Sequence, residues 1–315
     1  MKKCNKKTLI GVIITILCII GVILIFLFNT NTTSLNGLKE IWNNTIHPTS
    51  SQNVSELVPA DSTELLLYVI DTGNSDSLVI RTANDRAMLI DTGENDDDQR
   101  IIDTLNALGI TSLDALVATH PHSDHIGSME EILESIPVRT VYMTDFSEQA
   151  QSFKSITKQI KAKNIAAVNL TEGDTFSLGD VHFTALNPQN AEYDNANNSS
   201  IVLLAQYENT KFLFEGDAEK EAVSDMLAHN AEIMDVDVLK VGHHGSHNGT
   251  TQELLDAATP SLALITCGKD NDYGHPHKET LDLLSVENVT VLRTDKNSDI
   301  AVFSDGNEIT YKTAA

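Results

Sequence analysis

The residues best suited to chemistry lie in one hexapeptide, His120-Pro121-His122-Ser123-Asp124-His125. Three imidazoles and a carboxylate crowded together each need a partner, and one bound cation would satisfy several of them. His120 and His122 are two residues apart, so an extended segment points both rings the same way, while Asp124 and His125 turn toward a neighbouring point. This spacing predicts two adjacent metal half-sites, as in a dinuclear hydrolase. A histidine-rich surface loop is the alternative, but similar residues recur at later strand ends.

Asp217 is the second candidate, because it ends the apolar strand in Lys211-Phe212-Leu213-Phe214-Glu215-Gly216-Asp217. A carboxylate on such a turn can simply cap the helix that follows it. It can also bridge two metal ions that the histidine cluster holds. Beside that cluster we favour the bridging role.

Further histidines follow two other predicted strands. His243 and His244 suit one metal ligand and one neighbour that faces the substrate, and the sequence does not decide which is which. His247 is expected in solvent. His275 lies in the loop 273–277, framed by Gly and Pro, where it can hydrogen-bond a substrate oxygen or protonate a leaving group. An ordinary turn before the next helix is the alternative for this loop.

Short apolar runs alternate with helical patterns after residue 60, and these elements must position the candidate residues. Two batches of strands with interleaved helices predict an α/β fold of two sheets with helices packed on the outside. No internal repeat or second linker interrupts residues 61–315, which are therefore predicted to be one domain. The expected strands are 65–70, 78–80, 87–90, 113–118, 138–143, 174–178, 181–186, 200–207, 211–215, 236–241, 262–266, 289–293, 299–303 and 308–312. The expected helices are 98–108, 126–135, 147–163, 218–229, 250–258 and 277–285.

The N-terminal region predicts a membrane anchor. Four lysines precede the 20 uncharged residues 9–28, which as a helix would span roughly 30 Å, the thickness of a bilayer's hydrocarbon core. No small-residue cleavage site follows, so an uncleaved signal anchor is favoured over a cleaved signal or a buried core helix. Residues 1–28 are then a cytoplasmic stub and single span in the cell membrane, with the rest of the chain outside the cell. Residues 29–60, rich in Asn, Thr and Ser, are expected to form a flexible linker.

The charge balance is strongly acidic. The chain has 21 Lys and Arg against 45 Asp and Glu, a net charge of -24. Without the four lysines of the stub, 17 basic residues face 45 acidic ones, a net charge of -28. Such a surface argues against a general nucleic-acid binder, which needs a basic face. The domain also has a single cysteine, Cys267, so its stability must come from its core or from bound metal rather than from a disulfide.

Together the motifs resemble the metallo-β-lactamase fold superfamily. Within it they are most similar to the hydrolase domain at the C-terminal end of ComEC-type competence proteins and to the free-standing relatives of that domain. The resemblance runs from about residue 65 to residue 311. It rests on the following segments: Val69-Ile70-Asp71-Thr72-Gly73-Asn74-Ser75-Asp76-Ser77, Leu89-Ile90-Asp91-Thr92-Gly93, the hexapeptide 120–125, Asn198-Ser199-Ser200, Gly216-Asp217, Gly242-His243-His244-Gly245-Ser246 and Tyr273-Gly274-His275-Pro276.

The resemblance implies a four-layer αββα sandwich with two divalent metal ions that Asp217 and a hydroxide bridge. One ion would be held by His120 and His122 and the other by Asp124 and His125, with His243 or His244 completing the set. Zinc is expected from the imidazoles, and manganese is the alternative that the carboxylates and Asn198 leave open. The resemblance also implies roles for four other residues. Asp91 would orient a ligand histidine, and Asn198 and Ser246 would contact a ligand or the substrate. His275 would bind the leaving group or a phosphate oxygen.

The sequence departs from the superfamily pattern in one way that bears on the metals. Many members carry a third histidine between the first motif and the bridging aspartate, and residues 183–216 contain none. One metal is therefore expected to have three protein ligands or to be weakly held, with Asn198 or its serine neighbours in the vacant stretch.

Extracellular hydrolysis of a phosphodiester is the leading hypothesis, with nucleic acid, a nucleotide or a phosphate-linked wall polymer as substrate. Lys240, Lys269 and Lys278 lie near the motifs and are expected to make the cleft locally basic. No stable complex with nucleic acid is expected from so acidic a chain. The alternatives are a lactonase or esterase that acts on a small molecule, and a membrane-tethered metal-binding sensor without turnover.

Overall fold

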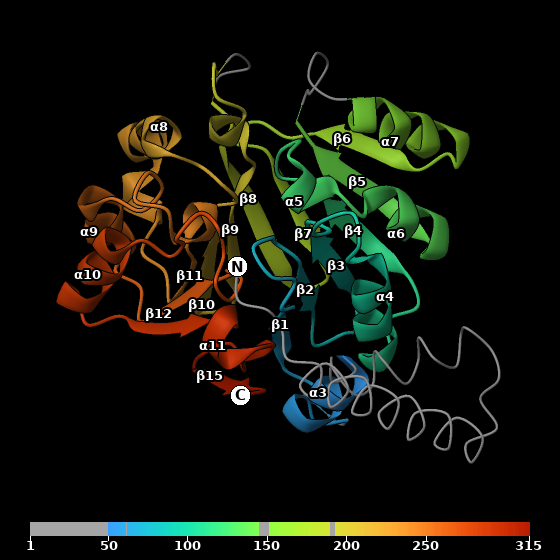
Figure 1. Ribbon diagram of the computed structural model, residues 1–315, viewed down its shortest axis with the longest axis horizontal. Helices are drawn as coiled ribbons and strands as arrows, with labels where there is room; N and C mark the ends of the chain where they lie inside the picture. The colour runs from blue at the N-terminus through green and yellow to red at the C-terminus, as the bar shows by residue number, and fades with distance from the viewer. Residues whose placement is uncertain (1–49, 61, 145–150, 190–192) are drawn as a thin grey trace, which may run out of the picture. The chain divides into compact units, whose positions relative to one another are not determined.

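Two β-sheets packed face to face form the centre of the molecule (Figure 1). The computed structural model describes residues 50–60, 62–144, 151–189 and 193–315. The predicted span 9–28 and the linker up to residue 49 lie outside these residues. Within the described ranges, no helix combines the length and the apolar character that crossing a bilayer requires.

The first sheet has eight strands in the order β15-β14-β1-β2-β3-β4-β5-β6. Strands β3 to β6 run parallel, and the remaining pairs are antiparallel. Their bounds are β1 (Leu65–Val69), β2 (Leu78–Arg81), β3 (Ala87–Ile90), β4 (Leu113–Val117), β5 (Val138–Met143), β6 (Ala166–Asn169), β14 (Ile300–Ser304) and β15 (Ile309–Thr313).

The second sheet has seven strands in the order β13-β12-β11-β10-β9-β8-β7, and β10 to β13 run parallel. Each sheet thus contains a parallel block, and in such blocks the loops at the carboxyl ends of the strands carry the functional residues. The strand bounds are β7 (Thr175–Leu178), β8 (Val181–Asn187), β9 (Val202–Tyr207), β10 (Thr210–Phe214), β11 (Val238–Lys240), β12 (Leu262–Ile265) and β13 (Thr290–Arg293).

Helices cover the outer face of each sheet, which gives the four-layer αββα sandwich that the resemblance implies (Figure 1). The first sheet is covered by α3 (Ser50–Leu57), α4 (Asp98–Ala107), α6 (Met129–Ser135) and α7 (Gln151–Ala162). The second sheet is covered by α8 (Lys220–Asn230), α9 (Gln252–Ala258) and α10 (Lys278–Val286). Two short helices, α5 (Ser123–Ile126) and α11 (Thr294–Asn297), and three 3-10 turns lie in the loops: η1 (Ala196–Ser199), η2 (Ala231–Ile233) and η3 (Gly242–Gly245).

Strand β1 shows why apolar runs rather than alternating patterns mark these strands. All five of its residues are buried. Leu65 and Leu67 face the core between the sheets, whereas Leu66 and Tyr68 face the core under the helices of the first sheet. Since both faces of the sheet are covered, neither face can be polar.

The structure corrects the predicted elements at two places. The expected flexible linker is wrong in its last part, because residues 50–57 form α3 and the side chains of Val54, Leu57 and Val58 are buried in the core. Strand β6 was not predicted, because its Ala-Ala-Val-Asn sequence is short and exposed. The start of the helix predicted at 147–163 lies outside the described residues, which begin again within it at Gln151.

Candidate metal centre

The hexapeptide 120–125 joins the end of β4 to α5. His122 is extended and precedes the first residue of α5, and Asp124 and His125 lie within that short helix. His120 and His125 are completely buried, whereas His122 is exposed. His120 Nε2 lies 3.1 Å from His122 Nδ1. The spacing therefore brings two ring nitrogens to one point, and the turn into α5 directs Asp124 and His125 to another.

Asp217 follows β10 and comes from the opposite sheet. Gly216 turns the chain with a φ of 54°, and a Cβ there would lie 3.1 Å from Ser200 Cβ. The backbone N–H of Asp217 donates to Ser200 Oγ at 3.0 Å. Helix α8 starts only at Lys220, with Glu219 in the capping position. The Asp217 carboxylate is therefore not the cap of this helix, and it is buried among the imidazoles instead.

His243 and His244 lie in η3, directly after β11. Both have left-handed backbone conformations, with φ of 49° and 52°. Their Nε2 atoms lie 3.8 Å and 3.7 Å from the same carboxylate atom, Asp217 Oδ2. Neighbouring residues of a strand would point to opposite sides, so the left-handed turn is what brings both rings to one carboxylate.

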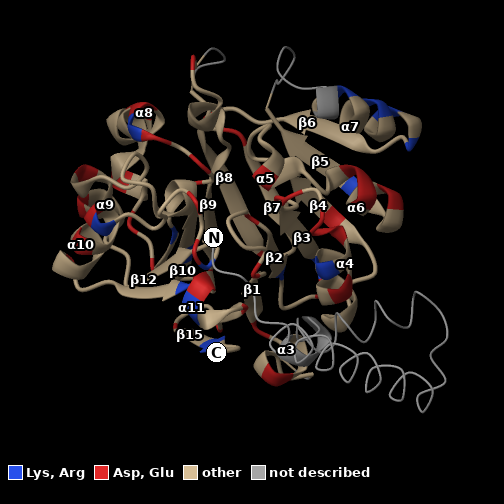
Figure 2. Cartoon of the chain, viewed as in Figure 1, with Lys and Arg blue, Asp and Glu red and all other residues tan. Residues whose placement is uncertain are grey.

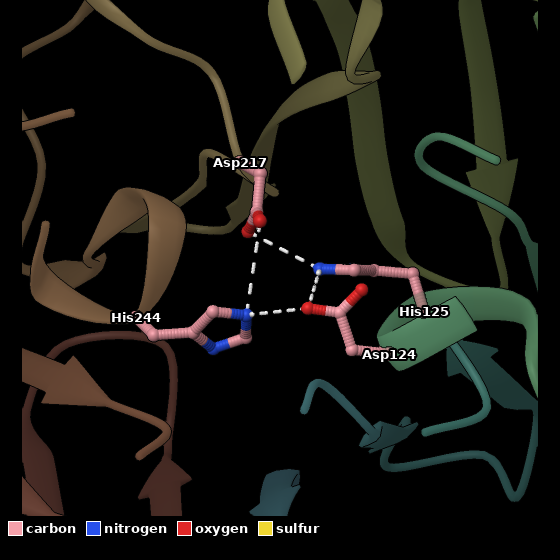
Figure 3. A group of neighbouring side chains, drawn as sticks. All are labelled: Asp124, His125, Asp217 and His244. Atoms are coloured by element: carbon pink, nitrogen blue, oxygen red, sulfur yellow. Dashed lines mark ion pairs between the residues drawn. The ribbon is translucent and has the colours of Figure 1, made fainter. Parts of the chain in front are cut away.

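Four of the predicted residues converge on a single point (Figure 3). One ligand atom from each of Asp124, His125, Asp217 and His244 lies within 4.8 Å of the others. His125 Nε2 is 3.2 Å from Asp217 Oδ1, and His244 Nε2 is 3.4 Å from Asp124 Oδ2. Three of these atoms, His125 Nε2, Asp217 Oδ1 and His244 Nε2, are buried and have no hydrogen-bond partner among the described residues. Buried polar atoms need partners, and a divalent cation at this point would satisfy all three.

Asp91 contacts the Nδ1 side of the His125 ring, away from the Nε2 atom that faces the cluster. Its Oδ2 lies 2.7 Å from His125 Nδ1, and the N–H and Oγ1–H of Thr119 both donate to the same carboxylate. Both side chains of the His125–Asp91 pair are fully buried. A carboxylate at Nδ1 fixes the orientation of the ring and leaves Nε2 free for a metal.

The carboxylates and imidazoles of the cluster shift one another's pKa values. Burial alone would raise the pKa of Asp217, but the attraction of His125 and His244 outweighs it and lowers this pKa well below its ordinary value. Burial alone would lower the pKa of His125, but the charges of Asp217 and Asp91 raise it well above its ordinary value. Burial, together with His125, lowers the pKa of His120 well below its ordinary value and keeps that ring neutral, the form that binds metal.

Asp76 and Lys240 form a buried ion pair behind His244, and the sequence alone did not single out Asp76. Lys240 Nζ is 2.8 Å from Asp76 Oδ2, and both side chains are almost completely buried. The hydroxyl of Thr266 donates to Asp76 Oδ1, which lies 3.5 Å from His244 Nδ1. The prediction that Lys240 makes the cleft basic is therefore wrong, because the Lys240 ammonium group is buried and paired with the Asp76 carboxylate. The signal for this role was available, since a lysine inside an apolar strand needs a buried partner.

The other predicted residues lie around the cluster. Asn198 is engaged elsewhere: its Oδ1 accepts from the Glu219 N–H at 3.0 Å, and its Nδ2 donates to Glu221 at 3.0 Å. Ser246 Oγ accepts from the N–H of Asn248 at 3.3 Å. Neither side chain contacts the metal-ligand atoms, so both stabilise loops.

The loop that carries His275 packs beside η3. The His275 ring centroid lies 5.5 Å from that of His243 and 6.2 Å from that of His244. Burial, reinforced by the neighbouring imidazoles, lowers the pKa of His275 to about 4, so this ring is neutral at pH 7. Its Nδ1 is buried without a hydrogen-bond partner within the described ranges. His247 is exposed, as the sequence predicts.

Comparison with known proteins gives the family. The family model described as the metallo-beta-lactamase superfamily matches residues 70–269. The chain belongs to the metallo-beta-lactamase superfamily. ComE operon protein 3 of Bacillus subtilis (strain 168) is 32% identical over 261 residues, which are 78% of this chain and 34% of that protein. Competence protein ComA of Neisseria gonorrhoeae is 29% identical over 241 residues, 76% of this chain and 32% of that protein. The chain thus spans about a third of the length of these relatives.

The fold is also similar to that of a solved structure. CmlA from Streptomyces venezuelae, a diiron β-hydroxylase, aligns with a TM-score of 0.54 at 17% identity, over 76% of this chain and 54% of that chain. At this identity the likeness concerns the fold alone. The chain therefore combines the superfamily fold with a His/Asp cluster that could hold a metal ion.

Proposed function

We propose that this protein is a membrane-anchored, dinuclear metal-dependent hydrolase that cleaves phosphodiesters outside the cell. The observation that carries the proposal is the convergence of three buried, unpartnered ligand atoms from α5, the β10 turn and η3. A site of this kind needs cations, and two divalent ions with a bridging carboxylate are suited to the in-line displacement of a phosphate ester.

We assign the donors to two metal positions. His120 and His122 would hold one ion, and Asp124, His125 and His244 the other, with Asp217 between them. The bound ions would supply Lewis acidity and a water that is ionised near neutral pH. Zinc suits the imidazoles, and manganese is the alternative. The chain contributes orientation: Asp91 aligns His125, and the turn of η3 aligns His244.

His275 would act on the substrate rather than on the metals. As a neutral ring beside η3, it can donate one hydrogen bond to a phosphate oxygen or accept one from a leaving group. A charged general acid at pH 7 is not the form that this environment favours. We therefore propose that it binds the substrate.

We propose that the substrate is a short molecule, or a longer one of which only a short segment enters the site. Acidic residues are spread over the loops and helices on both flanks of the molecule, with few basic residues between them (Figure 2). With Lys240 buried, the exposed Lys269 and Lys278 are what remains of the predicted basic patch. A long polyanion would be repelled, so no stable nucleic-acid complex is expected. The proposal of phosphodiester chemistry draws on the similarity to a protein named as a competence protein.

The membrane anchor is proposed from the sequence of residues 9–28. The four preceding lysines favour a cytoplasmic N-terminus and an external catalytic domain. Protease treatment of intact cells tests this orientation. The domain should be degraded from outside, and protection of the domain would contradict the proposal.

Activity is tested on a fragment that begins at residue 50, because α3 packs into the core. The stripped fragment is reloaded with zinc or manganese and offered bis(p-nitrophenyl) phosphate, single-stranded DNA and a lactone. Cleavage of the phosphodiesters is expected. Cleavage of the lactone alone would favour a lactonase or esterase, for which the acidic surface is no obstacle. Metal binding without turnover of any substrate would favour a sensor.

A further inference from the structure

His244 has two ring nitrogens, and they have different surroundings. Its Nδ1 lies 3.0 Å from the backbone oxygen of Thr266, whereas its Nε2 is buried in the four-residue cluster without a hydrogen-bond partner among the described residues. We propose that Asp76 is a positioning residue that acts through Thr266 to keep the His244 proton on Nδ1 and the lone pair on Nε2, where a metal ion can bind. This inference rests on the proposed metal centre and assigns a residue to its support.

Lys240 keeps Asp76 in its charged form. Asp76 precedes β2 in the first sheet, and Lys240 ends β11 in the second. Lys240 Nζ lies 2.8 Å from Asp76 Oδ2, and the two side chains are only 1% and 2% exposed. A buried ammonium group needs a counter-charge, and the oxygen that faces it must accept hydrogen bonds. Asp76 is therefore a carboxylate, which accepts hydrogen bonds and donates none.

Thr266 transmits this direction of hydrogen bonding to His244. The Thr266 hydroxyl donates its proton to Asp76 Oδ1, so the hydroxyl oxygen has only lone pairs left for other partners. His244 Nδ1 lies 3.3 Å from this hydroxyl oxygen and 3.0 Å from the backbone oxygen of Thr266. Both oxygens accept, so Nδ1 must carry the ring proton. The lone pair is then on Nε2, which faces the cluster.

The two histidines of the cluster are thus supported in different ways. Asp91 contacts His125 Nδ1 directly, at 2.7 Å. Asp76 Oδ1 lies 3.5 Å from His244 Nδ1, which is too far for a good N–H···O hydrogen bond. The Thr266 hydroxyl completes the connection between them. The influence of Asp76 on His244 should therefore depend on a hydroxyl group at position 266.

The backbone of Asp76 also connects to the part of the cluster that the first sheet supplies. Its N–H donates to Asp124 O at 3.1 Å, and its C=O accepts from the Gly93 N–H at 2.9 Å. A substitution that changes only the side chain at position 76 keeps both backbone hydrogen bonds. The loop should then keep its path, so side-chain variants test the hydrogen-bond chain Lys240–Asp76–Thr266–His244.

A direct role as a metal ligand is one alternative for Asp76. One of its oxygens lies within 4.8 Å of ligand atoms of Asp91 and His125. Both of its oxygens are already engaged, however, one with Lys240 and the other with Thr266. The Lys240 ammonium group would also repel a cation at this point. Asp76 therefore serves the cluster from outside it.

The other alternative is a purely structural role, in which Asp76 is only the counter-charge of Lys240 between the two sheets. Loss of the pair would then destabilise the fold, as expected for a buried ion pair. It would leave the metal affinity of the folded protein unchanged. Metal affinity measured well below the melting temperature separates this role from the positioning of His244.

The test is the affinity of the stripped full-length chain in detergent for Co²⁺, measured by competition with a chelator. In Asp76→Asn the amide oxygen should face Lys240, which turns the NH₂ group toward Thr266 and reverses the hydrogen-bond chain. This variant should bind Co²⁺ about 10–100-fold more weakly, as for other carboxylates behind ligand histidines. Thr266→Val should weaken binding by about 2–10-fold, the equivalent of one hydrogen bond. Thr266→Ser keeps the hydroxyl and should bind Co²⁺ as the wild type does.

The ring proton of His244 gives a second measurement that is independent of affinity. At saturating Co²⁺, the Nδ1–H of a ligand histidine gives a shifted proton resonance, and a buried, hydrogen-bonded proton exchanges slowly with water. Asp76→Asn and Thr266→Val should both shift the His244 resonance or speed its exchange. The resonance of His125 should stay in place, because Asp91 holds that ring.

Asp299→Asn is the matched control. Asp299 is a second fully buried aspartate, which lies 2.7 Å from Arg100 and accepts from the Tyr68 hydroxyl at 3.0 Å. Neither partner belongs to the metal cluster. This variant should lose stability in thermal melting and keep wild-type affinity for Co²⁺. The double variant of Asp76→Asn and Thr266→Val should bind no more weakly than Asp76→Asn alone, since both act through one chain of contacts.

The outcomes distinguish this inference from the proposed function. A loss of affinity in Asp76→Asn no larger than that in Asp299→Asn would overturn the inference and leave the metal centre standing. Equal losses in Thr266→Val and Thr266→Ser would also overturn it, because the hydroxyl would then play no part. A wild-type chain that binds no Co²⁺ would overturn the inference together with the proposed metal centre.

Discussion

A carboxylate oxygen lies close to Nδ1 of both His125 and His243, but only Asp91 makes a hydrogen bond to its histidine. His125 and Asp91 are fully buried and 2.7 Å apart, and Thr119 fixes Asp91 through two further hydrogen bonds. His243 and Glu219 are 3.1 Å apart and partly exposed. The first arrangement is built from residues of one sheet, around β3 and β4, and the second joins η3 to the start of α8.

The difference shows that the two histidine rings are not held equally firmly. Electrostatic interactions strengthen as water is excluded, so a buried carboxylate holds its histidine more tightly than a partly exposed one. We therefore expect the His125 ring to be held more firmly than the His243 ring, and the affinity of a metal ion at His125 to depend strongly on Asp91.

The largest effect is expected where both positions depend on one residue. Asp217→Ala removes the carboxylate between them and should lower kcat by roughly 10³-fold or more, since the activated water needs both ions. Metal analysis after dialysis, alongside the rate, checks this. Two firmly bound ions in Asp217→Ala would show that the carboxylate is not a bridge.

The buried ion pair of Lys240 and Asp76, which lies beside His244, is expected to stabilise the fold as well as the site. Lys240→Met leaves Asp76 buried without its cation, which should cost about 3–5 kcal/mol of unfolding free energy. Urea unfolding of the stripped protein measures it, and Lys278→Met, which breaks an exposed pair with Asp282, is the control. A loss no greater than that of the control would mean that Asp76 finds another partner.

The comparison between the two supporting carboxylates can be measured directly. Asp91→Asn should weaken the binding of an ion at His125 by about 10–100-fold, and by more than Glu219→Gln weakens metal binding, because only Asp91 makes a hydrogen bond to its histidine. Competition with a chelator gives both dissociation constants. Equal losses in the two variants would show that this hydrogen bond does not set the difference.

The smallest effect is expected at the edge of the site. His247 is exposed and interacts with His277, away from the ligand atoms. His247→Ala should leave kcat/KM within about two-fold of the wild type, as is usual for surface substitutions. A ten-fold loss in the phosphodiester assay would extend the substrate site to this side of η3.

Much of the site was predictable because its ligands follow strands. The strand before His120 and the strand before Asp217 are continuous apolar runs, and both were predicted close to their observed bounds. Sequence spacing also predicted that Asp124 and His125 turn toward one point, where they meet Asp217 and His244. The sequence could not show that Lys240 is buried against Asp76, because the two residues are far apart in the chain and meet only where the sheets pack.

The sequence by itself determined the kind of chemistry and the fold class, because residue types and apolar runs are local properties. It also limited the ligand set to a few histidines and aspartates. Only the tertiary structure decided that the rings of His243 and His244 both approach Asp217, since two left-handed residues in succession reorient them. It likewise decided that α3 belongs to the core and that Asn198 serves Glu219 rather than a metal, because each depends on contacts between segments that are distant in sequence.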